Sequence, residues 1–158
     1  MSRLPTLGPR GEGWVAIQAL LLVAIGLAGK VGPGWDGPLR VVTGGTGIAL
    51  LAGGGALALR GSRDLRAALT PLPYPRQDAE LVRTGVYAKV RHPIYGGLVL
   101  AAVGFGLLTA SLVALALAAV LLGFLLLKSR REEAWLMVRY PEYNAYRAET
   151  RRLIPWIG

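Results

Sequence analysis

Three long apolar stretches, separated by polar segments, dominate the sequence. The first covers residues 14–29, with Gln18 as its only strongly polar residue, and the second covers residues 39–59. The third covers residues 94–127, which as one helix would be about 51 Å long, whereas a bilayer's hydrocarbon core is only about 30 Å thick. The polar residues 109–111 near its middle therefore predict a tight helical hairpin, in which Gly104 and Gly106 would allow close backbone packing.

The remaining segments are polar or amphipathic. Residues 60–92 are polar and contain prolines, which predicts a loop. After residue 127 the chain becomes charged and amphipathic, Pro141 would break a helix there, and a short helix is expected over residues 142–150. The pattern predicts an all-α integral membrane protein with about four transmembrane helices and cytoplasmic amphipathic C-terminal helices. We expect one domain over residues 1–158, comprising two spans (1–60), a cytoplasmic loop (61–92), and a hairpin with C-terminal helices (93–158).

Composition supports a membrane protein and excludes several kinds of site. Hydrophobic residues make up 53% of the chain and charged residues 17%, and the mean hydropathy is +0.46. The absence of cysteine and the single histidine exclude disulfides, thiolate sites and histidine-rich metal sites. No cleavable signal is recognisable, so the first apolar stretch should stay in the membrane. Richness in Ala, Gly, Pro and Arg, with few lysines, is typical of a GC-rich bacterial genome, and the expected location is therefore the bacterial inner membrane.

The distribution of basic residues predicts the topology. Four spans with both termini in the cytoplasm would place sixteen of the eighteen Lys and Arg residues inside and two outside. The net charge of +9 is then mostly a consequence of topology, and it could also attract anionic lipid. Binding to nucleic acid is not needed to explain it.

Two ionisable clusters bracket the third apolar stretch. Arg91 and His92 precede it, and Glu132 and Glu133 follow it. Because a hairpin returns the chain to the same side, the clusters can converge on one polar pocket, as a zwitterionic ligand would require. Taken separately, each has an ordinary explanation: a helix start with Pro93 and basic anchors, and a solvated helix exit with local salt bridges.

Two other patterns also have alternative explanations. Tyr140, Tyr143 and Tyr146 could form an interfacial belt, or they could form an aromatic wall for a cofactor ring or a positive centre. The glycine runs at 44–47 and 53–55 lie inside an apolar span without a preceding strand. Helix packing through small residues, including a possible homodimer, is favoured over phosphate binding.

The C-terminal half resembles a known family of small membrane methyltransferases. Residues 81–97 resemble the G-x-Y-x-x-x-R-H-P-x-Y-x-G signature of the isoprenylcysteine carboxyl methyltransferase family and its phospholipid methyltransferase relatives. Residues 132–136 resemble their E-E-x-x-L pattern, and residues 140–146 and 150–155 resemble their C-terminal tail. The likeness covers residues 81–157.

The resemblance implies S-adenosylmethionine as methyl donor, bound in a pocket made by the hairpin and the C-terminal helices. Arg91 and His92 would bind its carboxylate, and Glu132 or Glu133 its ammonium. Tyrosines at positions 87 and 95 and in the tail would surround the adenosine. The full cofactor-binding set that we expect is Val82, Gly85, Tyr87, His92, Pro93, Tyr95, Glu132, Glu133, Tyr143 and Tyr146. The expected catalytic residues are Arg91, Glu133 and Arg151.

The methyl acceptor is left open by the residues. A prenylcysteine carboxylate is already an anion and would need only a cation to orient it, such as Arg91 or Arg151. The amine of phosphatidylethanolamine is mostly protonated and would need a base, for example Glu133 or His92. Isoprenylcysteine carboxyl O-methylation is the first expectation, phosphatidylethanolamine N-methylation the alternative, and a non-catalytic membrane protein with basic anchors the alternative of another class. In each case the lipid bilayer is a partner.

Overall fold

The first two apolar stretches each form one helix, and the third forms two. The computed structural model describes residue 5 and residues 7–32, 34–75 and 79–154. Within these ranges the chain forms five α-helices and two short 3-10 helices, and an isolated β bridge joins Val90 and Arg151. In chain order the elements are α1 (Glu12–Ala28), α2 (Gly37–Leu65), η1 (Arg66–Ala68), η2 (Gly85–Ala88), α3 (Pro93–Thr109), α4 (Leu112–Arg139) and α5 (Tyr143–Glu149).

Local capping explains the predicted hairpin turn, which is confirmed at residues 109–111. Ala110 ends α3 in the left-handed region (φ 50°), and Ser111 is the N-cap of α4. The Ser111 hydroxyl accepts a hydrogen bond from the backbone N–H of Ala114 (3.1 Å), which satisfies one free donor of the first turn. The same hydroxyl donates to the carbonyl of Ala28 (2.7 Å), so the turn is also fastened to the end of α1.

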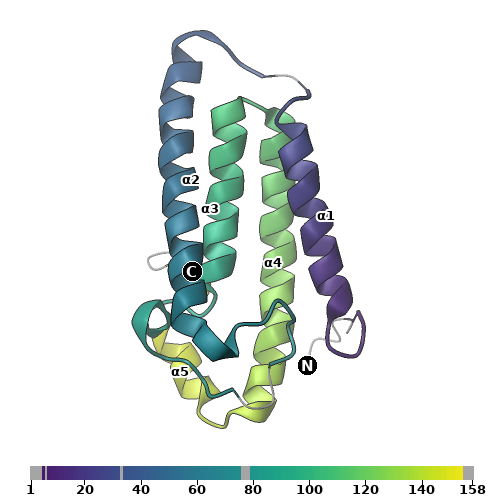
Figure 1. Cartoon of the computed structure of the whole chain (residues 1–158), viewed down its shortest axis with the longest axis vertical. Coiled ribbons are helices and arrows are strands. Elements are labelled where there is room, and N and C mark those ends of the chain that lie inside the picture. The colour runs from purple at the N-terminus through teal and green to yellow at the C-terminus, as the bar shows by residue number, and fades with distance from the viewer. Residues whose placement is uncertain (1–4, 6, 33, 76–78, 155–158) are drawn as a thin grey trace.

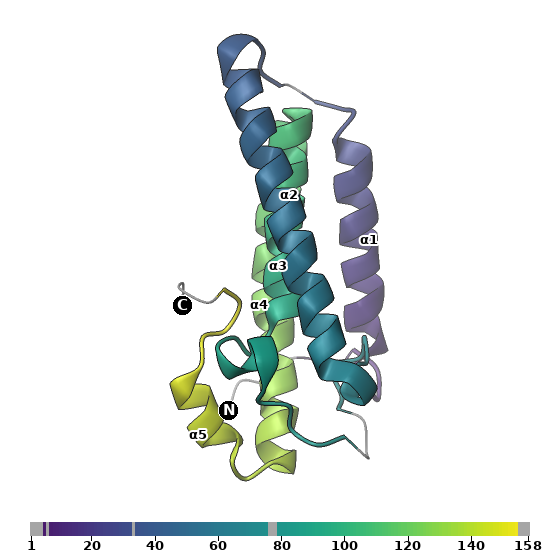
Figure 2. The same ribbon diagram turned by 60° about the vertical axis from the view of Figure 1, so that its left-hand side comes forward.

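The four long helices lie side by side and alternate in direction (Figure 1). The end of α1, the start of α2 and the α3–α4 turn lie at one end, whereas α5 and residues 66–75 and 79–92 lie at the other, where α4 extends beyond its neighbours (Figure 2). Helices α2 and α4 are long and apolar enough to cross a membrane, and α1 and α3, with 17 residues each, are shorter apolar helices. The all-α class is therefore confirmed, and the four-span topology stays a prediction.

Glycines allow α2 and α3 to pack backbone against backbone. A Cβ on Gly54 would lie 2.5 Å from the carbonyl oxygen of Gly97, and one on Gly47 would lie 2.7 Å from that of Gly104. Gly104 was expected to pack within the hairpin, and this expectation was wrong: it faces Leu51 of α2 instead. Gly106 does face α4, where a Cβ would meet the side chain of Leu115. The spacing of seven residues between Gly47 and Gly54, and between Gly97 and Gly104, keeps each pair on one face of its helix.

Apolar packing between α1, α3 and α4 forms the core, and further apolar side chains face outward. The core cluster consists of Ile25, Val99, Ala102, Ala118, Leu121 and Leu125. Outside it, Leu20 on α1 and Val41 on α2 are 70% and 77% exposed. A surface of this kind is disfavoured in water but suits contact with lipid tails. The end of the bundle away from the α3–α4 turn carries the start of α3, with Arg91 and His92 before it, and the part of α4 that contains Glu132 and Glu133.

Candidate functional site

A short tail segment holds the start of α3 in place. The backbone N–H groups of Arg91 and His92 donate to the carbonyls of Arg151 and Arg152 (2.9 Å each), and the N–H of Arg151 donates back to Lys89 (2.9 Å). Gly96 makes room for this tail, because a Cβ there would meet the carbonyl of Leu153. The strand-like pairing fixes the direction of the Arg91 and His92 side chains.

The Glu133 carboxylate joins α4 to this segment. Its Oε1 accepts a hydrogen bond from Arg91 Nε (3.0 Å) and lies 3.2 Å from His92 Nε2. Arg147 and Arg152 each bring Nε within 3.6 Å of its oxygens, and the Glu133 side chain is only 2% exposed. Arg91 in turn donates through Nη1 to the carbonyls of Arg147 and Thr150. A buried carboxylate surrounded by cations is compensated, so Glu133 acts as a structural centre of the site.

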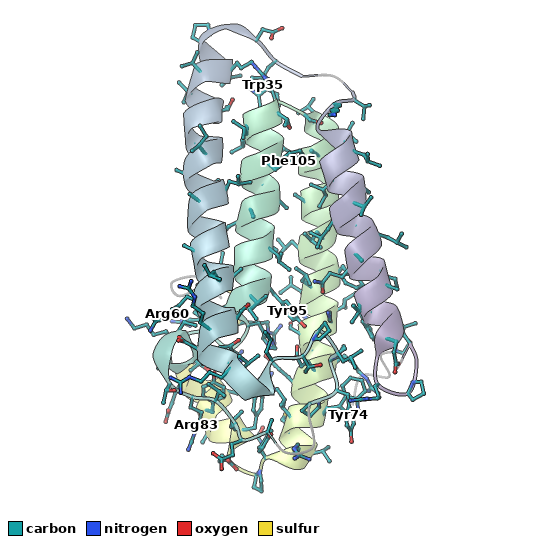
Figure 3. The ribbon with its side chains drawn as sticks, in the orientation of Figure 1. Trp35, Arg60, Tyr74, Arg83, Tyr95 and Phe105 are labelled. Carbon is teal, nitrogen blue, oxygen red and sulfur yellow. The ribbon has the colours of Figure 1, made fainter. Side chains whose placement is uncertain are left out.

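Glu132 lies beside it and makes a different set of contacts. The Tyr95 hydroxyl donates to Glu132 Oε2 (3.0 Å), and His92 Nδ1 lies 3.5 Å from the same oxygen. The rings of His92 and Tyr95 are parallel, with centroids 5.4 Å apart. Figure 3 shows Tyr95 toward the end of the bundle that carries Arg60, Tyr74 and Arg83, away from Trp35. His92 thus bridges both carboxylates, one with each ring nitrogen.

A cavity of about 370 Å³ opens next to these groups. This volume is within the range of roughly 300–1,000 Å³ that is usual for small-molecule sites. Its walls come from α1, the end of α2, residues 68–75 and 79–92, α3, α4 and the tail. The polar and aromatic residues that line it are Gln18, Ser62, Thr70, Glu80, Tyr87, Arg91, His92, Tyr95, Lys128, Glu132, Tyr140, Tyr143 and Tyr146.

Tyr87, Tyr143 and Tyr146, which lie outside the four long helices, line this cavity with raised pKa values. Burial raises the pKa of Tyr146 to about 12, against the opposing effect of Arg91. Burial, reinforced by the nearby glutamates, also raises the pKa values of Tyr87 and Tyr143. Tyr146 donates to the carbonyl of Tyr87 (2.7 Å). The buried hydroxyl of Tyr143 has no hydrogen-bond partner among the described residues, which is costly unless a ligand supplies one.

The structure brings most of the predicted site residues together. Of that set, the residues that line the cavity are Val82, Tyr87, Arg91, His92, Tyr95, Glu132, Tyr143 and Tyr146. Gly85, Pro93, Glu133 and Arg151 do not line it but lie in the supporting structure. Gly85 has a positive φ of 62° beside Asp64, which accepts from the N–H of Val86 (2.8 Å) and so orients the turn before Tyr87. Residues 155–157 of the tail motif lie outside the described residues.

Gln18 and Lys128 are among the cavity-lining residues that were not predicted. Lys128 is 1% exposed, and its Nζ donates to Gln18 Oε1 (2.6 Å) and to the carbonyl of Pro71 (3.3 Å). Gln18 is the lone polar residue of the first apolar stretch, and Lys128 is the first charged residue after the third apolar stretch. Those two signals could have indicated a polar contact between their helices.

Comparison with known proteins supplies the chemical context. The family model described as phospholipid methyltransferase matches residues 42–143, a segment that begins in α2 and ends at the start of α5. It includes the cavity-lining residues of α3 and α4. A search of the curated proteins gives no match.

Proposed function

We propose that this chain, which belongs to the phospholipid methyltransferase family, transfers a methyl group to the carboxylate of a lipophilic acceptor in the membrane. The family uses S-adenosylmethionine as methyl donor, and the chain is a membrane methyltransferase that depends on this cofactor and acts on a lipid acceptor. The choice of a carboxylate acceptor, as in isoprenylcysteine carboxyl O-methylation, and the residue roles below are our proposal.

The residues around the cavity fit this cofactor. A zwitterionic amino-acid end needs cations and a carboxylate close together, and Arg91, His92 and Glu132 all line the same cavity. The Tyr143 hydroxyl lacks a partner, and a polar ligand would satisfy it. When bound, the cofactor supplies an electrophilic methyl group on a positively charged sulfur.

Each residue then has a defined task. Arg91 and His92 hold the carboxylate, Glu132 holds the ammonium, and the aromatic rings of Tyr87 and Tyr146 lie against the adenosine. These groups orient the methyl group and keep water away from it, which is where most of the catalysis of such a displacement arises. All of them belong to rigid helices or to segments pinned by hydrogen bonds.

Glu133 and Arg151 act through other residues. Glu133 contacts Arg91 and His92 but does not line the cavity, so we assign it to positioning instead of direct contact with the cofactor. Arg151 holds the segment before α3 through its backbone, since its carbonyl accepts from Arg91 and its N–H donates to Lys89. Both residues would set the direction in which the Arg91 guanidinium points.

One observation supports the carboxylate acceptor: both central glutamates are already engaged. Glu133 is surrounded by four basic side chains, and Glu132 is bound by Tyr95 and His92. An acceptor amine is mostly protonated and must first lose a proton to a base. A carboxylate needs no base, because its oxygen already carries the reactive lone pair.

The alternative is N-methylation of phosphatidylethanolamine. It is favoured by Glu132, which lines the cavity and has a carboxylate that could accept a proton. Purified protein should be supplied with labelled S-adenosylmethionine and two acceptors, S-farnesyl-N-acetylcysteine and phosphatidylethanolamine in vesicles. The proposal expects label in a methyl ester that alkali releases as methanol; label in an alkali-stable methylated amine would refute it.

We also propose that the end with the cavity faces the cytoplasm, as the positive-inside pattern predicts. The chain has no cysteine, so single cysteines introduced at Lys30 and Arg83, which lie near opposite ends of the bundle, provide a clean test. A membrane-impermeant thiol reagent added to intact cells should label the cysteine at position 30 and not the one at 83. The reverse pattern would invert the topology.

A further inference from the structure

Lys128 is a buried cation that the roles above leave unused. It lies on α4 four residues before Glu132, about 6 Å further into the bundle along the helix axis. Its side chain is almost fully buried and still lines the cavity. Its ammonium is held by the Gln18 side-chain oxygen and the Pro71 carbonyl, with the Tyr95 ring centroid 5.2 Å away.

The partners that hold Lys128 are neutral. In the described part of the chain no carboxylate oxygen lies within 4.0 Å of its Nζ. Arg91, in contrast, has Glu133 as a direct counter-ion at 3.0 Å. Glu132 attracts Lys128 from one helical turn away but is bound by Tyr95 and His92. A buried charge is costly unless it is paired, so an anion is the ligand that this ammonium would favour.

The location of the pair identifies which ligand that is. Gln18 belongs to the apolar part of α1, and Lys128 stands at the end of the apolar part of α4. Arg91, His92 and Tyr143, in contrast, approach the cavity from the loop and the tail. Of the proposed cofactor groups, these three thus lie on the tail side of the cavity, and Glu132 lies one helical turn nearer to the tail than Lys128. The side toward the bundle interior is the one that a lipid-soluble acceptor would reach from the bilayer.

We propose that Lys128, oriented by Gln18, binds the carboxylate of the acceptor and sets the preference for anionic acceptors. This inference rests on the proposed function. One acceptor oxygen uses its lone pair to form the bond to the methyl carbon, while the carbon–sulfur bond breaks and its electron pair stays on sulfur. The anion and the sulfonium become a neutral ester and a neutral thioether, and no proton is released.

The same cation would also favour turnover. The unmethylated acceptor is a carboxylate and carries the negative charge that Lys128 binds, whereas the methyl ester product is neutral. An ammonium acceptor would be repelled from the position of Lys128. Binding of an acid and of its methyl ester should therefore respond very differently to the loss of this one charge.

The test compares Lys128→Met, which keeps the length and apolar stem, with Lys128→Arg, which keeps the charge. Lys30→Met, near the opposite end of the bundle, is the matched control. For each protein, saturated with S-adenosylhomocysteine, calorimetry measures the affinities for S-farnesyl-N-acetylcysteine and for its methyl ester. Thermal unfolding and the affinity for S-adenosylhomocysteine itself are measured in parallel.

We expect Lys128→Met to weaken binding of the acid about 10- to 100-fold, as expected for the loss of a hydrogen bond to a charged group. Its affinities for the ester and for S-adenosylhomocysteine should change less than about threefold, and its thermal stability should not fall, because an unpaired buried charge is removed. Lys128→Arg should retain the preference for the acid, and Lys30→Met should behave as the native protein.

Other outcomes overturn the inference. Equal weakening of acid and ester would give Lys128 a structural role, and a tenfold loss of affinity for S-adenosylhomocysteine would make it a cofactor residue. Undiminished acid binding in Lys128→Met would refute the inference and leave carboxyl methylation standing. Label transferred by the native protein only to phosphatidylethanolamine would refute both. If Lys128→Met does not fold, the second variant is Gln18→Leu, which frees the ammonium from its orienting partner. This variant should weaken binding of the acid and leave binding of the ester unchanged.

Discussion

The Glu133 carboxylate offers the sharpest test of how the site is held together. Glu133→Gln keeps the size of the side chain and removes its charge. Arg91 Nε and His92 Nε2, at 3.0 and 3.2 Å, would then face a neutral amide, and the Nε atoms of Arg147 and Arg152, both at 3.6 Å, would lose their counter-ion. The tail would therefore lose much of its attachment to α4.

The size of the effect follows from burial. Breaking a buried ion pair by removing one partner usually costs about 3–5 kcal/mol. Arg147 is 44% exposed, so water compensates that partner, and the lower end of the range, about 3 kcal/mol, is expected. For a chain of this size such a loss corresponds to a decrease in Tm of about 6–12 °C.

Thermal unfolding of the purified variant in detergent measures this directly, and limited proteolysis should show cleavage in the tail before the bundle opens. Glu142→Gln, an exposed acid at the start of α5, is the control and should unfold like the native protein. A Tm for Glu133→Gln within about 1 °C of the native value would refute the idea that this carboxylate holds the tail.

Three further predictions concern other parts of the molecule. Gly54→Ala should destabilise the protein by about 1–3 kcal/mol, because its Cβ would lie 2.5 Å from the Gly97 carbonyl oxygen. Gly55→Ala, whose Cβ would meet nothing within 4 Å, should leave the stability unchanged. Thermal unfolding of both variants checks this. Tyr143→Phe should weaken binding of S-adenosylhomocysteine about tenfold in a calorimetric titration without lowering stability, since its hydroxyl has no partner to lose; a loss of stability with unchanged binding would contradict this. The raised pKa of Tyr146, about 12 against a usual value of 10, makes the neutral phenol more favoured in the folded protein. Its contribution is therefore complete below pH 10 and is lost as the pH rises to about 12, so Tm should fall over that interval and fall less in Tyr146→Phe.

The apolar pattern alone was enough to predict the main architecture. A stretch of 34 residues is too long for one span, and the turn at residues 109–111 follows from that length together with the polar residues there. The convergence of Arg91 and His92 with Glu132 and Glu133 follows from the hairpin, because both clusters must lie at the same end. These conclusions depend on periodicity and chain length, which a single sequence displays.

The direction in which individual residues point from their helices could not be predicted in this way. Whether Glu133 faces the cavity or its basic neighbours depends on how α4 is rotated, and neighbouring glutamates in a helix differ by about 100°. Gly104 was placed against the wrong helix for the same reason. The position of Gln18 beside Lys128 needs the packing of α1 on α4, and these residues are 110 positions apart in the chain.

The pairing between residues 89–92 and 151–152 also has a consequence for biosynthesis. Arg91 leaves the ribosome 56 residues ahead of Arg147, the first tail residue that it contacts. At ordinary rates of translation this gap is on the order of seconds, during which the apolar helices can already enter the bilayer. Insertion into the membrane and acquisition of activity are consequently separate events, and a nascent chain halted before residue 150 would be anchored but inert.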